Sequence, residues 1–268
     1  MFDRHRFGRL AAATWSENRR TWGWFFLVGI LIHILLLGVF LFVDDGYAAF
    51  GFDGQSFVWF SGLFLLAPVF AARYFQAMAR RESALVLLMR PASAFEKWLL
   101  AVVVIVLLYP LAYVLAFQVA GLPAYLYGLV AAGAQHADMV ADLSPSRRVD
   151  LDAEFAKDWR YFLPWRAESE WRAVLPMLLA LQGFAVLGSL YFRSVPFIKT
   201  LVAGFAVLLV LTLATAVLGG EPGLFLGYWS REARLAPWQA VVLPAAWFGV
   251  PALLWAACLV ALREKEVA

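Results

Sequence analysis

The chain has 268 residues, of which 63% are hydrophobic and 15% are charged, with a formal net charge of +3 and a mean hydropathy of +0.75. An ordinary soluble domain carries about 25% charged residues. The composition therefore excludes an ordinary soluble globular protein and indicates an integral membrane protein. The single cysteine, Cys258, excludes a disulfide within the chain.

Apolar runs long enough to cross a membrane occur six times along the chain. A transmembrane helix needs about 20 mostly apolar residues. We therefore predict an all-α integral membrane protein with six transmembrane helices, at residues 22–43, 56–79, 94–119, 173–192, 198–218 and 238–262. The apolar region of a cleavable secretory signal spans about 7 to 15 residues. Since the first run is longer, it is interpreted as a retained span.

The distribution of charge predicts the orientation of these spans. Positive residues in short loops are retained on the cytoplasmic side. With both termini cytosolic, the cytosolic segments hold 14 of the 22 basic residues but only six of the 19 acidic ones. We therefore expect a multi-pass protein of the bacterial cytoplasmic membrane with its N- and C-termini in the cytosol.

Two segments outside the spans are long enough to have a structure of their own. Residues 1–21 place Phe7, Leu10, Ala11 and Trp15 at helical spacing among arginines, which predicts an amphipathic helix at the cytosolic membrane interface. An ordinary basic flank is the alternative. Residues 120–172 form an extracytoplasmic segment, in which an aromatic-rich stretch suggests a short helix at the membrane surface. Residues 22–268 make up the six-span domain.

Motifs of enzymes are missing from the sequence. There is no phosphate-binding loop, zinc-protease helix or nucleophile elbow. The histidines His5, His33 and His136 are predicted to lie in different compartments, which argues against a shared metal site. We therefore expect a transport subunit with no catalytic residue, metal or cofactor of its own.

Polar side chains within the predicted spans are few, and none of them is a carboxylate. Such groups are costly in lipid and are functional candidates by default. Two interpretations of each such side chain are open: it contacts a substrate, or it is hydrogen-bonded to a neighbouring helix. The candidates for a substrate pathway are His33, Tyr113, Gln118 and Gln182.

The stretch RRESALVLLMRPASAFEKW, residues 80–98, lies on the predicted cytosolic side between the second and third spans. Ser93 and Glu96 have the spacing of a capping box, so the third span is expected to begin at about Ala94. Pro91 cannot continue a preceding helix. Residues 82–89 are therefore predicted to form a short helix with an apolar run that needs a covering surface, either the protein's own spans and lipid or a soluble partner.

This stretch resembles the segment that follows the second span in ABC-2-type transporter permeases. In that family a form such as L-x-L-P-[AV]-S-x-x-E-[KF] introduces the third span. Pro91, Ala92, Ser93, Glu96 and Lys97 match this form, whereas Met89 and Arg90 depart from it. The layout of an N-terminal surface helix, six spans and cytosolic ends is also similar.

The resemblance implies the permease subunit of an ATP-driven exporter. The implied partners are a separate ABC ATP-binding subunit, which would hold ATP and magnesium, a second permease chain, and membrane lipids; no nucleic acid is expected. Residues 80–97 would be the coupling segment that sits in a groove of the ATPase. Its expected contact residues are Glu82, Ser83, Leu85, Leu88, Arg90, Pro91, Ser93, Glu96 and Lys97.

Two other classes of function remain open from the sequence. The chain could be a membrane-embedded enzyme that uses His136 and the acidic outer segment. It could also be a membrane anchor or assembly factor whose outer segment binds another envelope protein. The substrate of an exporter, which could be a lipid, a peptide or an amphipathic drug-like molecule, does not follow from the residues.

Overall fold

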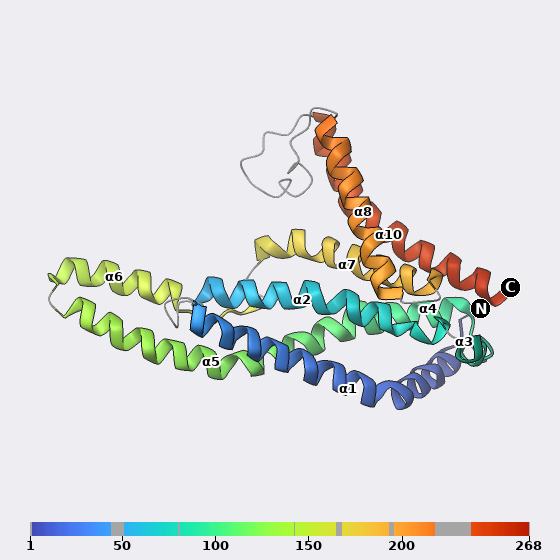
Figure 1. Cartoon of the computed structure of the whole chain (residues 1–268), viewed down its shortest axis with the longest axis horizontal. Helices are drawn as coiled ribbons and strands as arrows, with labels where there is room; N and C mark the ends of the chain where they lie inside the picture. The colour runs from blue at the N-terminus through green and yellow to red at the C-terminus, as the bar shows by residue number, and fades with distance from the viewer. Residues whose placement is uncertain are drawn as a thin grey trace. The chain divides into compact units, whose positions relative to one another are not determined.

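The structure is a computed structural model that describes residues 2–43, 51–79, 81–141, 143–164, 168–192, 196–217 and 237–267. Within these ranges the chain forms helices and short turns and contains no β-strand (Figure 1). The predicted all-α class is thus confirmed for the described part of the chain.

The structure describes helices along most of the chain. In chain order they are α1 (Arg4–Val43), α2 (Phe52–Tyr74), the 3-10 helix η2 (Gln76–Ala79), α3 (Arg81–Leu88), α4 (Ala94–Val102), the π-helix η3 (Val103–Leu108), α5 (Tyr109–Val140), α6 (Pro145–Asp158), α7 (Glu168–Tyr191), α8 (Pro196–Val217) and α10 (Pro237–Val267).

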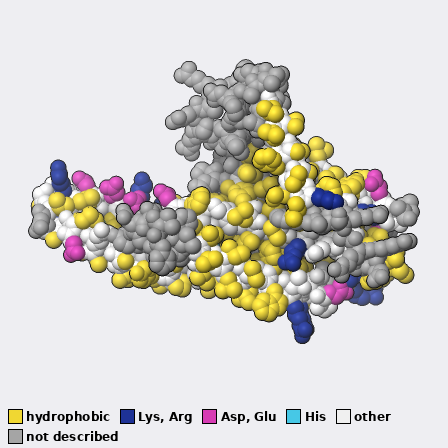
Figure 2. Space-filling model, in the orientation of Figure 1, with side chains coloured by type: hydrophobic (Ala, Val, Ile, Leu, Met, Phe, Trp, Pro, Cys, Tyr) yellow, Lys and Arg dark blue, Asp and Glu magenta, His cyan; other side chains and the backbone are white. Residues whose placement is uncertain are grey.

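Five helical stretches among the described residues are long and apolar enough to cross a membrane. They are Arg4–Leu37, Phe52–Tyr74, Ala94–Val140, Val174–Tyr191 and Pro244–Glu266. Hydrophobic side chains cover much of the visible surface, whereas acidic side chains gather along α6 (Figure 2). These features are typical of a multi-pass membrane protein. Helix α8 has 22 residues, but its side chains are described only in part, so the fifth predicted span, at residues 198–218, stays a prediction.

Helix α1 is longer than the predicted span. Its 40 residues run without interruption from Arg4 to Val43, so the predicted interfacial helix at residues 1–21 and the span at 22–43 share one helix. The reason is local, because no proline occurs between Arg4 and Val43 to end the helix.

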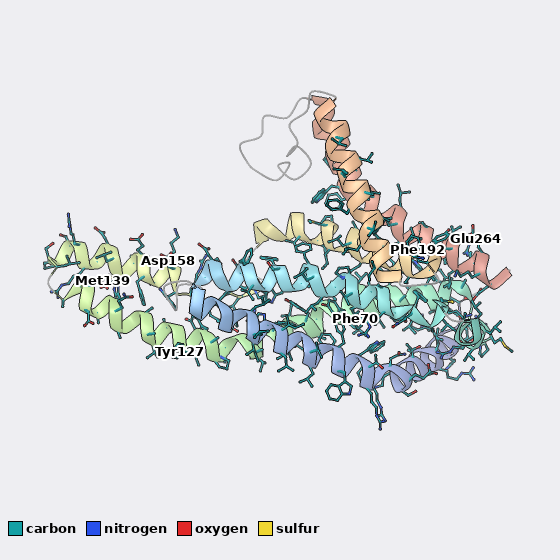
Figure 3. All side chains as sticks on the ribbon, viewed as in Figure 1. Phe70, Tyr127, Met139, Asp158, Phe192 and Glu264 are labelled. Atoms are coloured by element: carbon teal, nitrogen blue, oxygen red, sulfur yellow. The ribbon has the colours of Figure 1, made fainter. Side chains whose placement is uncertain are left out.

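The chain divides into two compact units. Unit 1 contains Met1–Glu17, Ala67–Tyr109 and Glu168–Ala268, and unit 2 contains Asn18–Leu66 and Pro110–Ala167. In unit 1, Phe70 of α2, labelled in Figure 3, belongs to the packed interior. Its ring stacks on that of Tyr109 with 4.7 Å between the ring centroids.

Helices α7 and α10 pack closely in unit 1. A Cβ atom on Gly183 of α7 would lie 3.2 Å from both Leu254 and Trp255 of α10, so the glycine permits this approach. Trp255 Nε1 donates to the Leu179 carbonyl at 3.1 Å, and Trp98 Nε1 of α4 donates to the Trp255 carbonyl at 2.9 Å. The hydrogen bonds of these two indole N–H groups therefore connect α4, α7 and α10.

The π-helix η3 is explained by Pro110, which lies two residues after its end. In its register the Tyr109 N–H donates to the Val104 carbonyl, five residues back. The next donor in that register would be residue 110, which is Pro110 and has no N–H. Gln182 Nε2 of α7 donates instead to the Ile105 carbonyl at 3.1 Å. The side chain thus satisfies a backbone group that would be costly to bury without a partner.

Unit 2 contains a helical hairpin that extends the third predicted span. The helical stretch Ala94–Val140 has 47 residues, which corresponds to roughly 70 Å, about twice the thickness of a hydrocarbon core. Helix α5 continues to Val140 instead of ending near Val119, and α6 returns alongside it (Figure 1). Residues 120–158 are therefore a helical hairpin rather than a loop with one short surface helix.

Specific contacts hold this hairpin closed. His136 Nε2 of α5 lies 2.7 Å from Asp152 Oδ1 of α6, and the His136 ring stacks on Phe155. The Tyr125 hydroxyl donates to the Trp159 carbonyl at 3.0 Å. Pro145 follows Ser144 and occupies the first turn of α6. A backbone N–H in the first turn has no partner within the helix, so the N–H that proline lacks is not missed there. Ser144 and Pro145 therefore begin a helix after the turn.

Candidate functional site

The predicted capping box opens α4 in the structure. Ser93 Oγ accepts from the Glu96 N–H at 3.3 Å, and Glu96 Oε2 accepts from the Ser93 N–H at 2.9 Å. Helix α4 begins at Ala94, as the sequence predicts. Before it, α3 ends at Leu88 and is separated from α4 by a turn that contains Arg90 and Pro91. The proline break is thus confirmed as well.

The N-terminus of the chain is fixed to this capping box. Glu96 is 0% exposed, and its Oε1 accepts from Arg6 Nη2 at 2.7 Å, from Arg6 Nε at 3.2 Å and from the Asp3 N–H at 3.0 Å. Together with the Ser93 N–H, these donors satisfy a buried carboxylate, which needs such partners to stay charged. Glu96 therefore joins α4 to the start of α1.

Asp3 caps the first turn of α1. Its Oδ1 accepts from the His5 N–H at 2.9 Å and from the Arg6 N–H at 3.4 Å. These backbone hydrogen bonds lower the pKa of Asp3 below its ordinary value. The carboxylate thus caps the helix that carries Arg6 toward Glu96.

Lys97 links three elements of unit 1. Its side chain is 4% exposed, and Nζ donates to the Leu88 carbonyl at 3.0 Å and to Glu266 Oε1 at 2.7 Å. Leu88 is the last residue of α3, where carbonyl groups have no partner within the helix. Lys97 of α4 therefore holds the end of α3 and the end of α10 at once.

A third ion pair joins Arg90 to Glu17 and is more exposed than the other two. Arg90 Nη2 lies 2.5 Å from Glu17 Oε2, on the exposed part of α1. An exposed pair of this kind contributes little to stability. It nevertheless places Arg90 against the chain's own first helix.

Two apolar residues of α3 and the residue after the helix are exposed. Leu85, Val86 and Met89 are 52%, 64% and 81% exposed, whereas Leu88 is half-buried. Pro91 is also exposed. The backbone of Glu82 and Ser83 belongs to α3, but their side chains lie outside the described residues. Among the described side chains of this segment, Leu85, Val86, Met89 and Pro91 are exposed and apolar, whereas Ser93, Glu96 and Lys97 bind within the chain.

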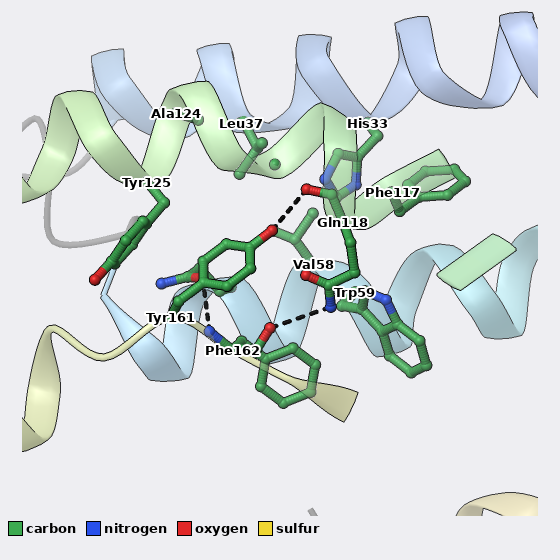
Figure 4. Close-up of a pocket in the computed structure, with 12 residues that line it drawn as sticks. His33, Leu37, Val58, Trp59, Phe117, Gln118, Ala124, Tyr125, Tyr161 and Phe162 are labelled. Atoms are coloured by element: carbon green, nitrogen blue, oxygen red, sulfur yellow. Dashed lines mark hydrogen bonds between the residues drawn. The ribbon is translucent and has the colours of Figure 1, made fainter. Parts of the chain in front are cut away.

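The predicted pathway residues divide between the units. In unit 2, Tyr113 donates to the Trp59 carbonyl at 2.7 Å, and His33 and Gln118 line one cavity (Figure 4). In unit 1, Gln182 bonds the Ile105 carbonyl. Tyr113 and Gln182 are thus hydrogen-bonded to neighbouring helices, which was one of the two interpretations open from the sequence.

The sequence did not reveal the partners Arg6 and Glu266. They lie 90 and 169 positions from Glu96 and Lys97, so no local spacing connects them. The complementary charge at both termini and in one cytosolic loop is the only sequence signal that could have suggested these pairs.

The hairpin of α5 and α6 contains His136, the histidine on which the enzyme alternative depends. His136 pairs with Asp152, an arrangement that can orient an imidazole as a base. Among the described residues, no hydroxyl or thiol is hydrogen-bonded to His136, and no group of three metal-ligating side chains is found. The contact between His136 and Asp152 joins α5 to α6 in the hairpin.

Comparison with known proteins finds no matching family model, no matching curated protein and no matching solved structure.

Proposed function

We propose that the chain is the permease subunit of an ATP-driven ABC exporter in a bacterial cytoplasmic membrane, and that α3 receives the motion of a separate ATP-binding subunit. One observation carries this proposal. Lys97 binds both the end of α3 and Glu266 of α10, so a displacement of α3 is transmitted directly to the helices that follow it.

The outer face of α3 suits a protein partner. Leu85 and Val86 of α3 and Met89 directly after it form an exposed apolar strip, and the eight-residue helix is too short to span a membrane. Exposed apolar surface of this kind is typical of interaction sites. The ATP-binding subunit would cover the strip, and it would supply the ATP and magnesium that this chain has no motif to bind.

The contacts of unit 1 support the proposed topology of six spans with cytosolic ends. Arg6 reaches Glu96, and Lys97 reaches Glu266. The N-terminus, the segment after α3 and the C-terminal helix therefore meet on one side of unit 1. The excess of basic residues in these three segments favours the cytosolic side.

Co-purification tests this proposal. A soluble protein with a phosphate-binding loop, encoded beside this chain, should co-purify with it in detergent, and the pair should hydrolyse ATP. Leu85→Glu with Met89→Glu should remove the co-purification, because two carboxylates would replace the apolar contact. Val149→Glu on α6 is the matched control, since Val149 is also exposed and apolar. Unchanged co-purification of the double variant would contradict the proposal.

A further inference from the structure

A cavity in unit 2 lies between α1, α2, α5 and the segment that follows α6 (Figure 4). Its lining is mostly apolar and aromatic, with ring surface from Trp59, Phe117, Tyr125 and Phe162. The space that the centre of a water-sized sphere can occupy is about 30 Å³, and all the space free of atoms, open solvent at the mouth included, is about 360 Å³. A small polar group fits inside, and a larger apolar body fits against the rings.

His33 of α1 is a buried polar side chain that lines this cavity. It is 6% exposed, and its ring meets the Phe117 ring edge to face at 4.8 Å. Neither ring nitrogen makes a hydrogen bond to a described residue of the chain. A buried imidazole without a partner is costly, so the cavity has to supply one.

Tyr161 presents an acceptor to the same space. Its hydroxyl donates to the Gln118 carbonyl at 2.6 Å, which leaves lone pairs of the oxygen for another donor. Burial raises the pKa of Tyr161, so the hydroxyl keeps its proton. Gln118 Nε2 donates to the Phe162 carbonyl at 3.1 Å and fixes this wall of the cavity.

Gly121 of α5 creates the space between these two polar atoms. A Cβ atom at this position would lie 3.9 Å from His33 Nε2 and 3.9 Å from the Tyr161 hydroxyl oxygen. Both atoms therefore border one small volume that has no side chain in it. An alanine would fill this volume at ordinary contact distances and without a clash.

We propose that this cavity binds a small neutral molecule with a hydroxyl group, of the alcohol or phenol class, and that the hydroxyl lies between His33 and Tyr161. A hydroxyl donates to one of these groups and accepts from the other. No carboxylate, lysine or arginine side chain lines the cavity, which favours a neutral ligand over an ion. The apolar body contacts the aromatic rings. This site is independent of the proposed function, because it lies within unit 2 and needs no other subunit.

The test uses the full chain in lipid nanodiscs, with phenol as the probe and benzene as the matched probe without a hydroxyl. NMR of isotope-labelled histidine reports on the three histidines, and His33→Gln identifies the His33 signal. Phenol should shift this signal saturably, and benzene should shift it much less. Equal shifts with the two probes, or a shift that does not saturate, would overturn the proposal.

Two variants locate the hydroxyl. Gly121→Ala should weaken phenol binding by about tenfold or more, because the added methyl group occupies the hydroxyl's place. Gly133→Ala on the same helix is the control, since a Cβ there meets nothing within 4 Å. Tyr161→Phe should weaken phenol binding by roughly fivefold, the effect of one neutral hydrogen bond. Wild-type affinity in a folded Gly121→Ala variant would overturn the proposal.

Discussion

Lys97 Nζ of α4 lies 2.7 Å from Glu266 Oε1 of α10, although the two residues are 169 positions apart in the chain. The same Nζ holds the last carbonyl of α3. A single ammonium group therefore connects a short helix, the start of the helix that follows it and the end of the chain. A force on α3 can reach two long helices through this group.

Replacement of Lys97 should destabilise the protein. Lys97→Met removes the donor to the Leu88 carbonyl and to Glu266, which should lower the free energy of unfolding by about 1–3 kcal/mol. The measurement is denaturation of the purified protein in mixed micelles. Glu266→Gln completes a double-mutant cycle, and strictly additive effects of the two changes would contradict the contact.

Glu96 should control the attachment of the N-terminus. Glu96→Ala removes the acceptor of Arg6 and of the Asp3 N–H, so trypsin should cleave after Arg4, Arg6 or Arg9 faster than in the wild type. Glu17→Ala breaks only the exposed pair with Arg90 and should change the cleavage rate little. The cleavage is followed by mass spectrometry. Equal rates in the wild type and in Glu96→Ala would show that Glu96 does not hold this end.

The contribution of Gln182 to stability should depend on the proline at residue 110. Gln182→Leu leaves the Ile105 carbonyl without its donor and should lower the midpoint of thermal unfolding. Pro110→Ala restores a backbone N–H to this turn, so Gln182→Leu should cost less in the Pro110→Ala background. If the cost is the same in both backgrounds, the hydrogen bond does not compensate for the proline.

The proposed orientation predicts which residues are labelled from outside the cell. Cys258 is the only cysteine and is buried, so the wild-type chain is a suitable background. A membrane-impermeant maleimide should label Val149→Cys in intact cells, and it should label Met89→Cys only after permeabilisation. Labelling of Met89→Cys in intact cells would contradict the proposed topology.

Local signals in the sequence predicted local structure correctly. Ser93 and Glu96 are three positions apart and form the capping box, because both partners lie within one helical turn. Pro91 marks the break after α3 for an equally local reason. The helical class follows from apolar runs of spanning length.

Features that depend on distant residues did not follow from the sequence. The length of the hydrocarbon core predicted an end of the third span near Val119, but it says nothing of how far the helix itself continues, and α5 runs to Val140. The proximity of Gly121 to His33 and Tyr161 likewise depends on the packing of separate segments. The sequence identified His33 and Gln118 as candidates, but their cavity required the structure.

Site-specific photocrosslinking at Val86 tests the central claim most directly. Val86 is 64% exposed on α3, so a photoreactive amino acid placed there in living cells should form a covalent adduct with the ATP-binding subunit. The same amino acid at Val149 on α6 should form no such adduct. An ATP-binding subunit that crosslinks at neither position, while remaining functional with this chain, would contradict the assignment of α3 as the coupling helix.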